Sequence, residues 1–214
     1  MDNNKKGLFI TFEGADGCGK TTQIELLNKY LKEKKYNTIV TLEPGGSDIG
    51  KSLRQILLHH DGFVSDVCEM FLYLADRAQH IETVVLSNVD KGNIVLCDRH
   101  IDSTVAYQGY ARGNDIEKID LLNNIATKNY KPDLTFVFDV DSEIAQQRVG
   151  KTKDRLEKEG LEFHKKVRFG YLELAKKYPQ RIKVINANLS IEEVFEQVKK
   201  IIDEILWKKY QKKH

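Results

Sequence analysis

The sequence contains little of what builds covalent or metal-held scaffolds. Its 214 residues include only three cysteines, Cys18, Cys68 and Cys97, an odd number at wide spacings. Such a set fits neither a disulfide framework nor a zinc site. Because disulfides are rare in reducing compartments, we expect free thiols and a cytoplasmic location.

Long apolar runs and a strong charge imbalance are missing as well. No stretch approaches the ~20 apolar residues that cross a bilayer, and the polar residues 1–7 do not resemble a signal peptide. We therefore expect no membrane partner. The formal net charge is only +2, whereas dedicated nucleic-acid-binding proteins carry a marked basic excess, so we expect no nucleic-acid partner. The basic residues 208–213 are interpreted as a solvated helix end.

With only three prolines and no low-complexity tract, the sequence contains no segment that suggests an interdomain linker. A chain of this length can bury a sizeable core without disulfides. We therefore predict a single domain over residues 1–214. Within it, the polar segment at about residues 149–155 contains Lys and Gly and is expected to be either a small lid or a simple loop.

Short apolar runs alternate with segments of helical periodicity along the chain. Strands are expected at Leu8–Glu13, Thr38–Leu42, Ile94–Cys97, Leu134–Val140 and Ile182–Ile185. Helices are expected at about Thr21–Lys34, Ile49–His59, Ser65–Val89, Ile116–Lys128, Leu156–Tyr178 and Ile191–Leu206. This alternation predicts an α/β fold in three layers, with a parallel sheet of about five strands flanked by helices.

A glycine-rich motif joins the first expected strand to the first expected helix. Residues 14–21 match the phosphate-loop pattern G-x-x-x-x-G-K-[ST]. Its glycines let backbone N–H groups turn inward around phosphate oxygens, and the following helix adds a partial positive charge. Lys20 can reach the β- and γ-phosphates, and Thr21 can bind Mg²⁺. The motif predicts a P-loop NTPase-type fold. The expected ATP-binding residues are Gly14, Ala15, Asp16, Gly17, Cys18, Gly19, Lys20, Thr21 and Thr22.

A second acidic element follows another buried strand. Asp98 directly follows the apolar run Ile94–Cys97, and the carboxyl ends of parallel strands face the ligand crevice. Together with the phosphate loop, Asp98 is interpreted as the Walker-B carboxylate that holds Mg²⁺ directly or through water.

The remaining sequence favours a small-molecule kinase over other phosphate-loop proteins. A Ras-type GTPase needs an N-K-x-D motif after a later strand, but Asn28 and Lys29 lie in the first helix without the required Asp. A motor or helicase would usually need a longer chain or a ring.

Several motifs together point to one family. They lie at residues 12–23, 43–47, 75–80, 98–100, 102–109, 131–135 and 154–157. In content and order they resemble the motifs of bacterial-type thymidylate (dTMP) kinases, a group of P-loop nucleoside monophosphate kinases. The resemblance covers essentially the whole chain. It implies transfer of the γ-phosphate of ATP to dTMP, with Mg²⁺, by a homodimer.

The resemblance also implies roles for residues around the transferred phosphate. Asp16 would accept a hydrogen bond from the 3′-hydroxyl of dTMP and help orient Mg²⁺, although it could instead only balance the adjacent helix N-terminus. Arg99 and Arg54 would hold the acceptor phosphate with their planar forks, and Arg54 could alternatively be a solvated surface charge. The catalytic residues implied are Asp16, Lys20, Arg99 and Lys153.

The base-reading residues implied lie on two segments. Arg77 would bond the thymine carbonyl and Tyr73 would stack on the ring, because residues four apart share a helix face; a rim tyrosine and a structural arginine are the alternative. Gln108 could bond the pyrimidine edge, and Tyr107 would pack beneath the sugar and disfavour a 2′-hydroxyl. The other dTMP-binding residues implied are Glu43, Pro44, Ser103 and Thr104. A separate apolar stripe is expected to face the core, formed by Val67, Met70, Phe71, Leu74, Ala78, Ile81 and Val85.

The sequence departs from the family pattern at four positions. Leu42 replaces a usual Arg, Tyr73 a usual Phe, and Asn186 a usual Asp near the adenine pocket, the last with little expected effect. Gly17 stands where some members carry a catalytic Arg. The positive charge is therefore expected from the 149–155 region, unless its lysines are simply solvated. The candidates are Arg148, Lys151, Lys153 and Arg155, of which Arg148 could instead stack on adenine.

Two other functions stay open at this point. One is a P-loop kinase for another acceptor, such as dUMP, UMP/CMP or a deoxynucleoside. Arg99 and the loop at Pro44 favour a phosphorylated acceptor over a nucleoside. The other is a nucleotide-binding protein without turnover, for which Leu42 and Tyr73 are the only sequence support.

Overall fold

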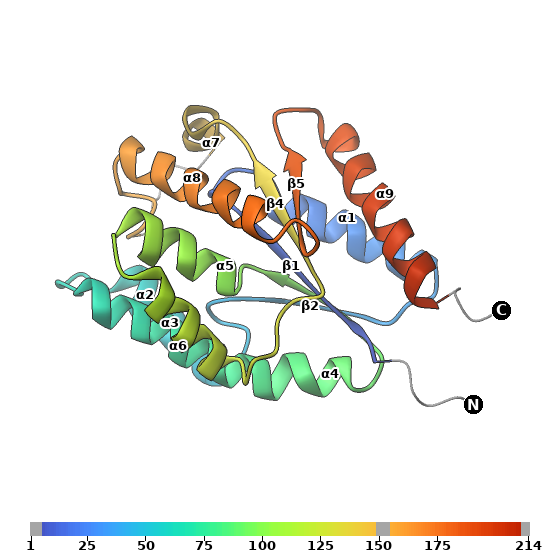
Figure 1. The fold of residues 1–214 in the computed structure, drawn as a ribbon, viewed down its shortest axis with the longest axis horizontal. Coiled ribbons are helices and arrows are strands. Elements are labelled where there is room, and N and C mark those ends of the chain that lie inside the picture. The colour runs from blue at the N-terminus through green and yellow to red at the C-terminus, as the bar shows by residue number, and fades with distance from the viewer. Residues whose placement is uncertain (1–5, 149–154, 211–214) are drawn as a thin grey trace.

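The computed structural model describes residues 6–148 and 155–210, and its centre is one parallel sheet (Figure 1). The strands lie in the order β2-β3-β1-β4-β5, and every neighbouring pair is parallel. This confirms the predicted α/β fold with a five-stranded parallel sheet. The strands are β1 Leu8–Gly14, β2 Thr38–Leu42, β3 Ile94–Asp98, β4 Leu134–Asp139 and β5 Ile182–Asn186.

Helices cover both faces of this sheet, as the alternating pattern predicts (Figure 1). The first part of the chain forms α1 Lys20–Glu33, α2 Asp48–His59, α3 Asp66–His80, the π-helix η1 Ile81–Leu86 and α4 Ser87–Val89. The remainder forms α5 Ile101–Thr104, the π-helix η2 Val105–Ala111, α6 Ile116–Ala126, α7 Ser142–Arg148, α8 Leu161–Lys177 and α9 Ile191–Tyr210. None of the helices within the described ranges is long and apolar enough to cross a membrane.

The central strand β1 is buried along its whole length because both of its faces are covered. Since side chains alternate along a strand, Ile10 and Phe12 pack against α1 and α9, whereas Phe9 packs against η1 on the other face. A third cluster joins α3, η2 and α8 around Tyr107 and Tyr171. The carboxyl end of β1 is thereby held rigidly where the phosphate loop begins.

The expected helix at Ser65–Val89 is interrupted by the π-helix η1 between α3 and α4. The hydroxyl groups of Thr83 and Ser87 and the amide of Asn88 donate to main-chain carbonyls in this stretch. Such side-chain bonds compete with the regular helical ladder and favour a wider turn. The structure also adds α5, η2 and α7, which the sequence pattern did not indicate.

The apolar stripe predicted on α3 is partly wrong. Val67 and Phe71 are 51% and 53% exposed, and Ala78 is exposed as well. The inward face of α3 instead carries polar side chains whose partners lie inside the protein, among them the buried Glu69 and Arg77. The remaining members of the stripe are buried as expected: Met70, Leu74, Ile81 and Val85.

Candidate active site

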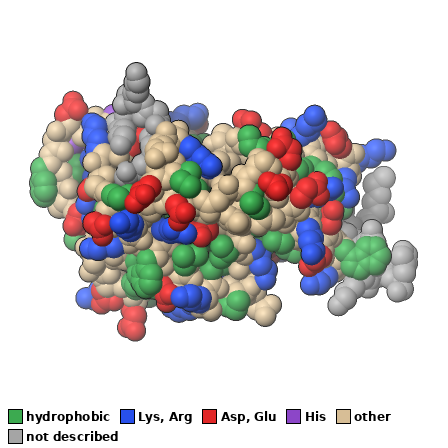
Figure 2. Space-filling view, turned by 90° about the horizontal axis from the view of Figure 1, so that it is seen from above, with side chains coloured by type: hydrophobic (Ala, Val, Ile, Leu, Met, Phe, Trp, Pro, Cys, Tyr) green, Lys and Arg blue, Asp and Glu red, His purple; other side chains and the backbone are tan. Residues whose placement is uncertain are grey.

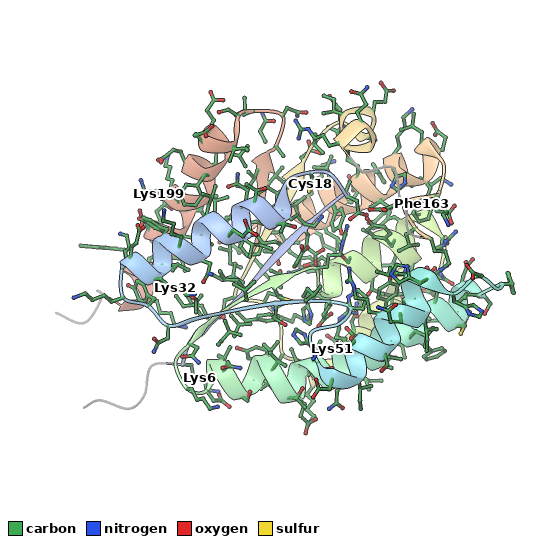
Figure 3. All side chains as sticks on the ribbon, turned by 180° about the vertical axis from the view of Figure 1, so that it is seen from behind. Lys6, Cys18, Lys32, Lys51, Phe163 and Lys199 are labelled. Carbon is green, nitrogen blue, oxygen red and sulfur yellow. The ribbon has the colours of Figure 1, made fainter. Side chains whose placement is uncertain are left out.

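The phosphate loop leaves β1 and enters α1 through backbone conformations that favour glycine. Gly17 and Gly19 have φ angles of 79° and 92°, in the left-handed region. Lys20 begins α1, and its Nζ donates to the carbonyl oxygens of Gly14 and Ala15 at 3.1 and 3.0 Å. Figure 3 labels Cys18 in this loop, at the amino end of α1. The loop therefore folds around the lysine that the sequence predicts to meet phosphate.

Gly17 also lies too close to another element to carry a side chain. A Cβ atom built there would lie 2.3 Å from the backbone oxygen of Ala145 on α7. An arginine at this position could not be accommodated unless α7 moved. A cationic side chain that approaches the phosphates in addition to Lys20 must therefore come from a residue other than 17.

An open cavity of about 910 Å³ lies beside the phosphate loop. Of the residues predicted to bind ATP, seven line this cavity: Asp16, Gly17, Gly19, Lys20, Thr21, Thr22 and Arg148. Leu42, Glu43, Arg54, Asp98 and Arg99 complete its lining. The side chains of Ala15 and Cys18 are buried in the core, so these two residues can contact a ligand only through their backbone atoms.

The two predicted Mg²⁺ ligands, Thr21 and Asp98, both line this cavity and carry side-chain oxygen atoms. The Oδ1 atom of Asp98 is buried and has no hydrogen-bond partner among the described residues. Thr21 is exposed on the first turn of α1. Mg²⁺ prefers oxygen ligands and usually takes most of them from phosphates and water. Two oxygen-bearing side chains beside a phosphate site therefore fit Mg²⁺. The described part of the chain contains no group of three or more His, Cys, Asp or Glu that could hold a metal ion.

A second cavity of about 580 Å³ adjoins the first. Four residues line both cavities: Asp16, Glu43, Arg54 and Arg99. The other residues predicted to bind dTMP also line it: Pro44, Tyr73, Arg77, Ser103, Thr104, Tyr107 and Gln108. Leu58 and Leu156 line it as well and were not predicted from the sequence. The structure thus brings together residues as far apart in the sequence as Asp16 and Leu156, including residues of α2, α3, α5 and η2.

Arg99 and Asp16 form the junction between the two cavities. Arg99 Nη2 lies 2.6 Å from Asp16 Oδ1, and the guanidinium stacks 5.2 Å from the ring centre of Tyr107. Burial opposes ionisation of Asp16, but the charges of Arg99 and Lys20 outweigh it and hold its pKa at about 2. A carboxylate and a guanidinium are therefore both charged at the point where two phosphate groups would meet.

The sequence as a whole matches the family described as "Thymidylate kinase" over residues 12–198. This chain belongs to the thymidylate kinase family. A relative named thymidylate kinase from Thermoanaerobacter sp. (strain X514) is 48% identical over 206 residues, which is 96% of this chain and 99% of that protein. Another from Clostridium novyi (strain NT) is 46% identical over 199 residues, 91% of this chain and 97% of that protein.

The fold agrees with a solved member of the family. The crystal structure of thymidylate kinase from Ehrlichia chaffeensis superimposes with a TM-score of 0.76 at 37% sequence identity. The alignment covers 92% of this chain and 99% of that one. The family's P-loop fold is therefore present over nearly the whole chain.

In this family member, Arg77 is held deep in the floor of the second cavity. Only 1% of it is exposed. Its guanidinium donates to Glu43 Oε2, Thr104 Oγ1, Asn123 Oδ1 and the carbonyl oxygen of His100, at 2.7 to 2.9 Å. A guanidinium has five N–H donors, so these four bonds leave one for a group in the cavity.

Glu43 serves as the anchor of this arginine. Its Oε2 accepts from Arg77, and its Oε1 lies 2.8 Å from Nδ1 of His80 and 2.9 Å from Nδ1 of His100. Burial opposes ionisation of Glu43, but His100 and Arg77 outweigh it and hold the pKa well below the usual range. Although Glu43 lines the cavity, its carboxylate is occupied by protein groups. Glu43 was predicted from the sequence, but its contacts with His80 and His100 were not, although these histidines end the motifs at residues 75–80 and 98–100.

The cationic residues near position 150 divide into three cases. Arg148 lines the phosphate-loop cavity and donates to the carbonyl oxygen of Ala187 at 3.3 Å. Lys151 and Lys153 lie outside the described residues. Arg155 ion-pairs with Glu69, far along α3 from the phosphate loop. Among the described candidates, Arg148 is therefore the one beside the predicted ATP site.

A buried carboxyl group missed by the sequence analysis lies beneath Arg99. Glu13 Oε1 accepts from the backbone N–H of His100 at 2.8 Å, and Oε2 accepts from Ser103 Oγ at 2.5 Å and Tyr171 OH at 3.1 Å. Burial, reinforced by the charge of Asp102, raises the pKa of Glu13 to about 7, against the opposing hydrogen bonds. In the sequence, only the position of Glu13 directly before the phosphate loop could have indicated that this residue lies at the site.

We expect this carboxyl group to make stability depend on pH. Because the folded pKa of about 7 exceeds the ordinary value of 4.5, the folded state binds the proton more tightly. Its stabilisation is complete below pH 4.5 and lost as pH rises through 7. Relative to Glu13→Gln, the wild type should lose up to about 3 kcal/mol of unfolding free energy between pH 5 and 8, at about 1.4 kcal/mol per pKa unit. Urea unfolding at both pH values measures this.

A matched exposed carboxylate provides the control. Glu25 is exposed on α1, and Glu25→Gln should follow the wild type at both pH values. A constant offset between Glu13→Gln and the wild type, equal at pH 5 and pH 8, would show that Glu13 is ionised like any surface glutamate.

Proposed function

We propose that this protein phosphorylates dTMP to dTDP with ATP and Mg²⁺, as a step toward dTTP. One observation carries this assignment. The cavity at the phosphate loop and the cavity lined by the predicted dTMP residues share Asp16, Glu43, Arg54 and Arg99. A donor phosphate in the first cavity and an acceptor phosphate in the second would therefore meet at Arg99 and Arg54, the arrangement that direct phosphoryl transfer requires.

The donor side would act through charge and position. Lys20 and the N–H groups of the loop would hold the β- and γ-phosphates, and Arg148 would stack on adenine. Mg²⁺, held by Thr21 and Asp98, would neutralise charge on the phosphate oxygens. We further assign Lys153 as a cation that approaches the transferred phosphate. Because the acceptor is already an anionic phosphate, the transfer needs no strong base.

The acceptor side would fix the monophosphate at its phosphate and its sugar. The forks of Arg99 and Arg54 would grip its phosphate. The main-chain oxygen of Pro44 holds Arg54 at 2.8 Å, which steadies that fork. Asp16 would accept from the 3′-hydroxyl, and Tyr107 would lie against the sugar where a 2′-hydroxyl would crowd it.

The base would be read by residues of α3 and η2. Tyr73 would stack on the ring, while Arg77 would offer its remaining N–H to the thymine carbonyl. Gln108 would bond the pyrimidine edge. The π-helix η2 supports this use, since such wide turns often occur at functional sites.

The deciding experiment measures ADP release by the purified protein with ATP and Mg²⁺, with and without dTMP. We expect strong stimulation by dTMP, weak stimulation by dCMP and UMP, and none by thymidine, which lacks the phosphate that Arg99 would hold. Chelation of Mg²⁺ should abolish the rate. Stimulation by thymidine or by another monophosphate instead of dTMP would show that the acceptor is not dTMP. No stimulation at all would indicate a nucleotide-binding protein without turnover.

We also propose that the protein works in the cytoplasm as a homodimer. The helices α2, α3 and α6 pack side by side and expose apolar side chains at helical spacing. These are Ile49, Ile56, Val67, Phe71, Leu121 and Ile125. Sedimentation equilibrium should give twice the 24.7 kDa chain mass, and a monomer at micromolar concentration would refute the dimer. Unlike this apolar helix surface, the face of the molecule shown in Figure 2 carries acidic and basic side chains interspersed among the others.

A further inference from the structure

The base-facing side of α3 includes a residue that the proposed function leaves without a role. Glu69, Tyr73 and Arg77 are spaced four apart and therefore share one face of the helix. Tyr73 and Arg77 line the second cavity. Glu69 lies one turn earlier, is fully buried, and contacts Gln108 on η2. Burial of a carboxylate is costly unless it has partners, so the placement of Glu69 beside the amide of Gln108 suggests a specific role.

The contact fixes which end of the Gln108 amide faces Glu69. Gln108 Nε2 donates to Glu69 Oε1 at 2.8 Å. A carboxylate only accepts hydrogen bonds, so the amide must turn its NH₂ group toward it. The carbonyl oxygen then lies on the other side of the amide. Gln108 is only 1% exposed and lines the second cavity, so it has little room to turn over.

Two arginines hold Glu69 as an acceptor. Arg155 Nη2 lies 2.5 Å from Glu69 Oε2, and Arg112 Nη2 lies 3.7 Å from the same atom. Arg155 is itself fixed, because its Nε donates to the carbonyl oxygen of Leu57 at 3.0 Å. Each guanidinium carries only donors. The contacts from Arg155 through Glu69 to Gln108, an ion pair followed by a hydrogen bond, form a chain that therefore has one direction.

We propose that Glu69 is a positioning residue that sets the base selectivity of this enzyme by making Gln108 present its carbonyl oxygen to the base. This rests on the proposed function. A carbonyl oxygen accepts the N3–H that thymine and uracil carry. The unprotonated N3 of cytosine is itself an acceptor, so two acceptors would face each other in a buried site. Selection of the oxo-pyrimidine over the amino-pyrimidine thus originates one residue behind the one that touches the base.

The substitution Glu69→Gln tests the direction of this chain. Arg155 still requires an acceptor, so the carbonyl of the new amide should face it. The NH₂ group of the new amide then faces Gln108. Gln108 must turn its own carbonyl toward that donor and its NH₂ group toward the cavity, where it suits N3 of cytosine.

The measurement is kcat/KM for dTMP and for dCMP. In Glu69→Gln we expect the dTMP-to-dCMP ratio to fall at least about tenfold, the effect of mispairing one buried polar group. Damage to the fold alone would lower both values together and leave the ratio unchanged. The matched control is Asp66→Asn, which removes a neighbouring partner of Arg112 on the same helix without touching Gln108. Its ratio should equal that of the wild type.

A swapped pair gives the second test. In the double variant Glu69→Gln, Gln108→Glu, the amide can accept from Arg155 and donate to the carboxylate at 108, which presents an acceptor to the cavity again. We expect the preference for dTMP to return toward the wild-type ratio. This variant keeps the net charge and carries the test if Glu69→Gln alone does not fold.

The outcomes separate the two proposals. If the wild type shows no dTMP-dependent ADP release, the proposed function fails and this inference fails with it. If the wild type prefers dTMP but a folded Glu69→Gln variant keeps its ratio within twofold, only the role of Glu69 is overturned. A folded swap variant that gains no selectivity over Glu69→Gln also overturns it.

Discussion

Replacing Lys20 by alanine should lower kcat by about a thousandfold or more while leaving the protein folded. The phosphate loop curves around this ammonium group, which lies within 3.1 Å of two loop carbonyl oxygens. No other described lysine lines the adjoining cavity. Preorganised charge of this kind is usually the largest single contribution to phosphoryl transfer, because developing charge on the phosphate then needs no rearrangement of water.

The stability of Lys20→Ala should change little. In the ligand-free protein the lysine contributes only hydrogen bonds to loop carbonyls, each worth about 1 kcal/mol. Circular dichroism and urea unfolding would establish that the fold is intact, and ADP release would give kcat. Lys32, exposed in the last turn of the same helix, is the matched control, and Lys32→Ala should retain full activity. If Lys20→Ala kept more than a tenth of the wild-type rate, the phosphate site would have to be placed elsewhere.

Replacing Arg99 should produce the second largest loss, and chiefly toward the acceptor. We expect Arg99→Gln to lower kcat/KM for dTMP about a hundredfold or more, since charge-assisted bonds from a fork contribute about 1.5–3 kcal/mol each. The variant also removes the partner of Asp16, so the pKa of Asp16 should rise from about 2. Initial rates at varied dTMP, with ATP saturating, measure the effect.

Two further variants make that result specific. Arg99→Lys keeps the charge but not the planar fork, so it should lie between Arg99→Gln and the wild type. Arg168 forms ion pairs with Asp139 and Asp141 and lines neither of the two joined cavities, so Arg168→Gln should leave turnover unchanged. If KM for ATP rose as much as KM for dTMP in Arg99→Gln, the residue would belong to the donor site.

Local patterns in the sequence predicted the fold and the phosphate loop. Alternating strand and helix periodicity sufficed for the parallel sheet. The phosphate loop is contiguous, so Lys20 and Thr21 could be assigned from spacing and mechanism alone. The more distant residues, such as Arg99 and Gln108, came from motifs in family order rather than from local physics, and the structure places them along a single cavity.

What the sequence could not give are contacts that depend on packing. Glu69 and Gln108 are 39 positions apart, and no spacing rule pairs a residue of α3 with one of a π-helix. Val67 and Phe71 were wrongly placed in the core for a related reason. Periodicity assigns apolar residues to the buried face, whereas the inward face of α3 is polar and satisfied by partners from other elements.

The bonding of Arg77 limits how the specificity of this protein can change. Its four acceptors come from separate parts of the chain, so the same guanidinium that faces the base also ties the interior together. A substitution of Arg77 would leave these buried oxygens without hydrogen-bond donors, so its main effect would be to lower stability, more than to alter base recognition. Evolution or engineering toward other nucleotides would therefore have to change residues that hold less of the interior together, such as Tyr73, Gln108 or the Glu69 behind it, and leave Arg77 unchanged.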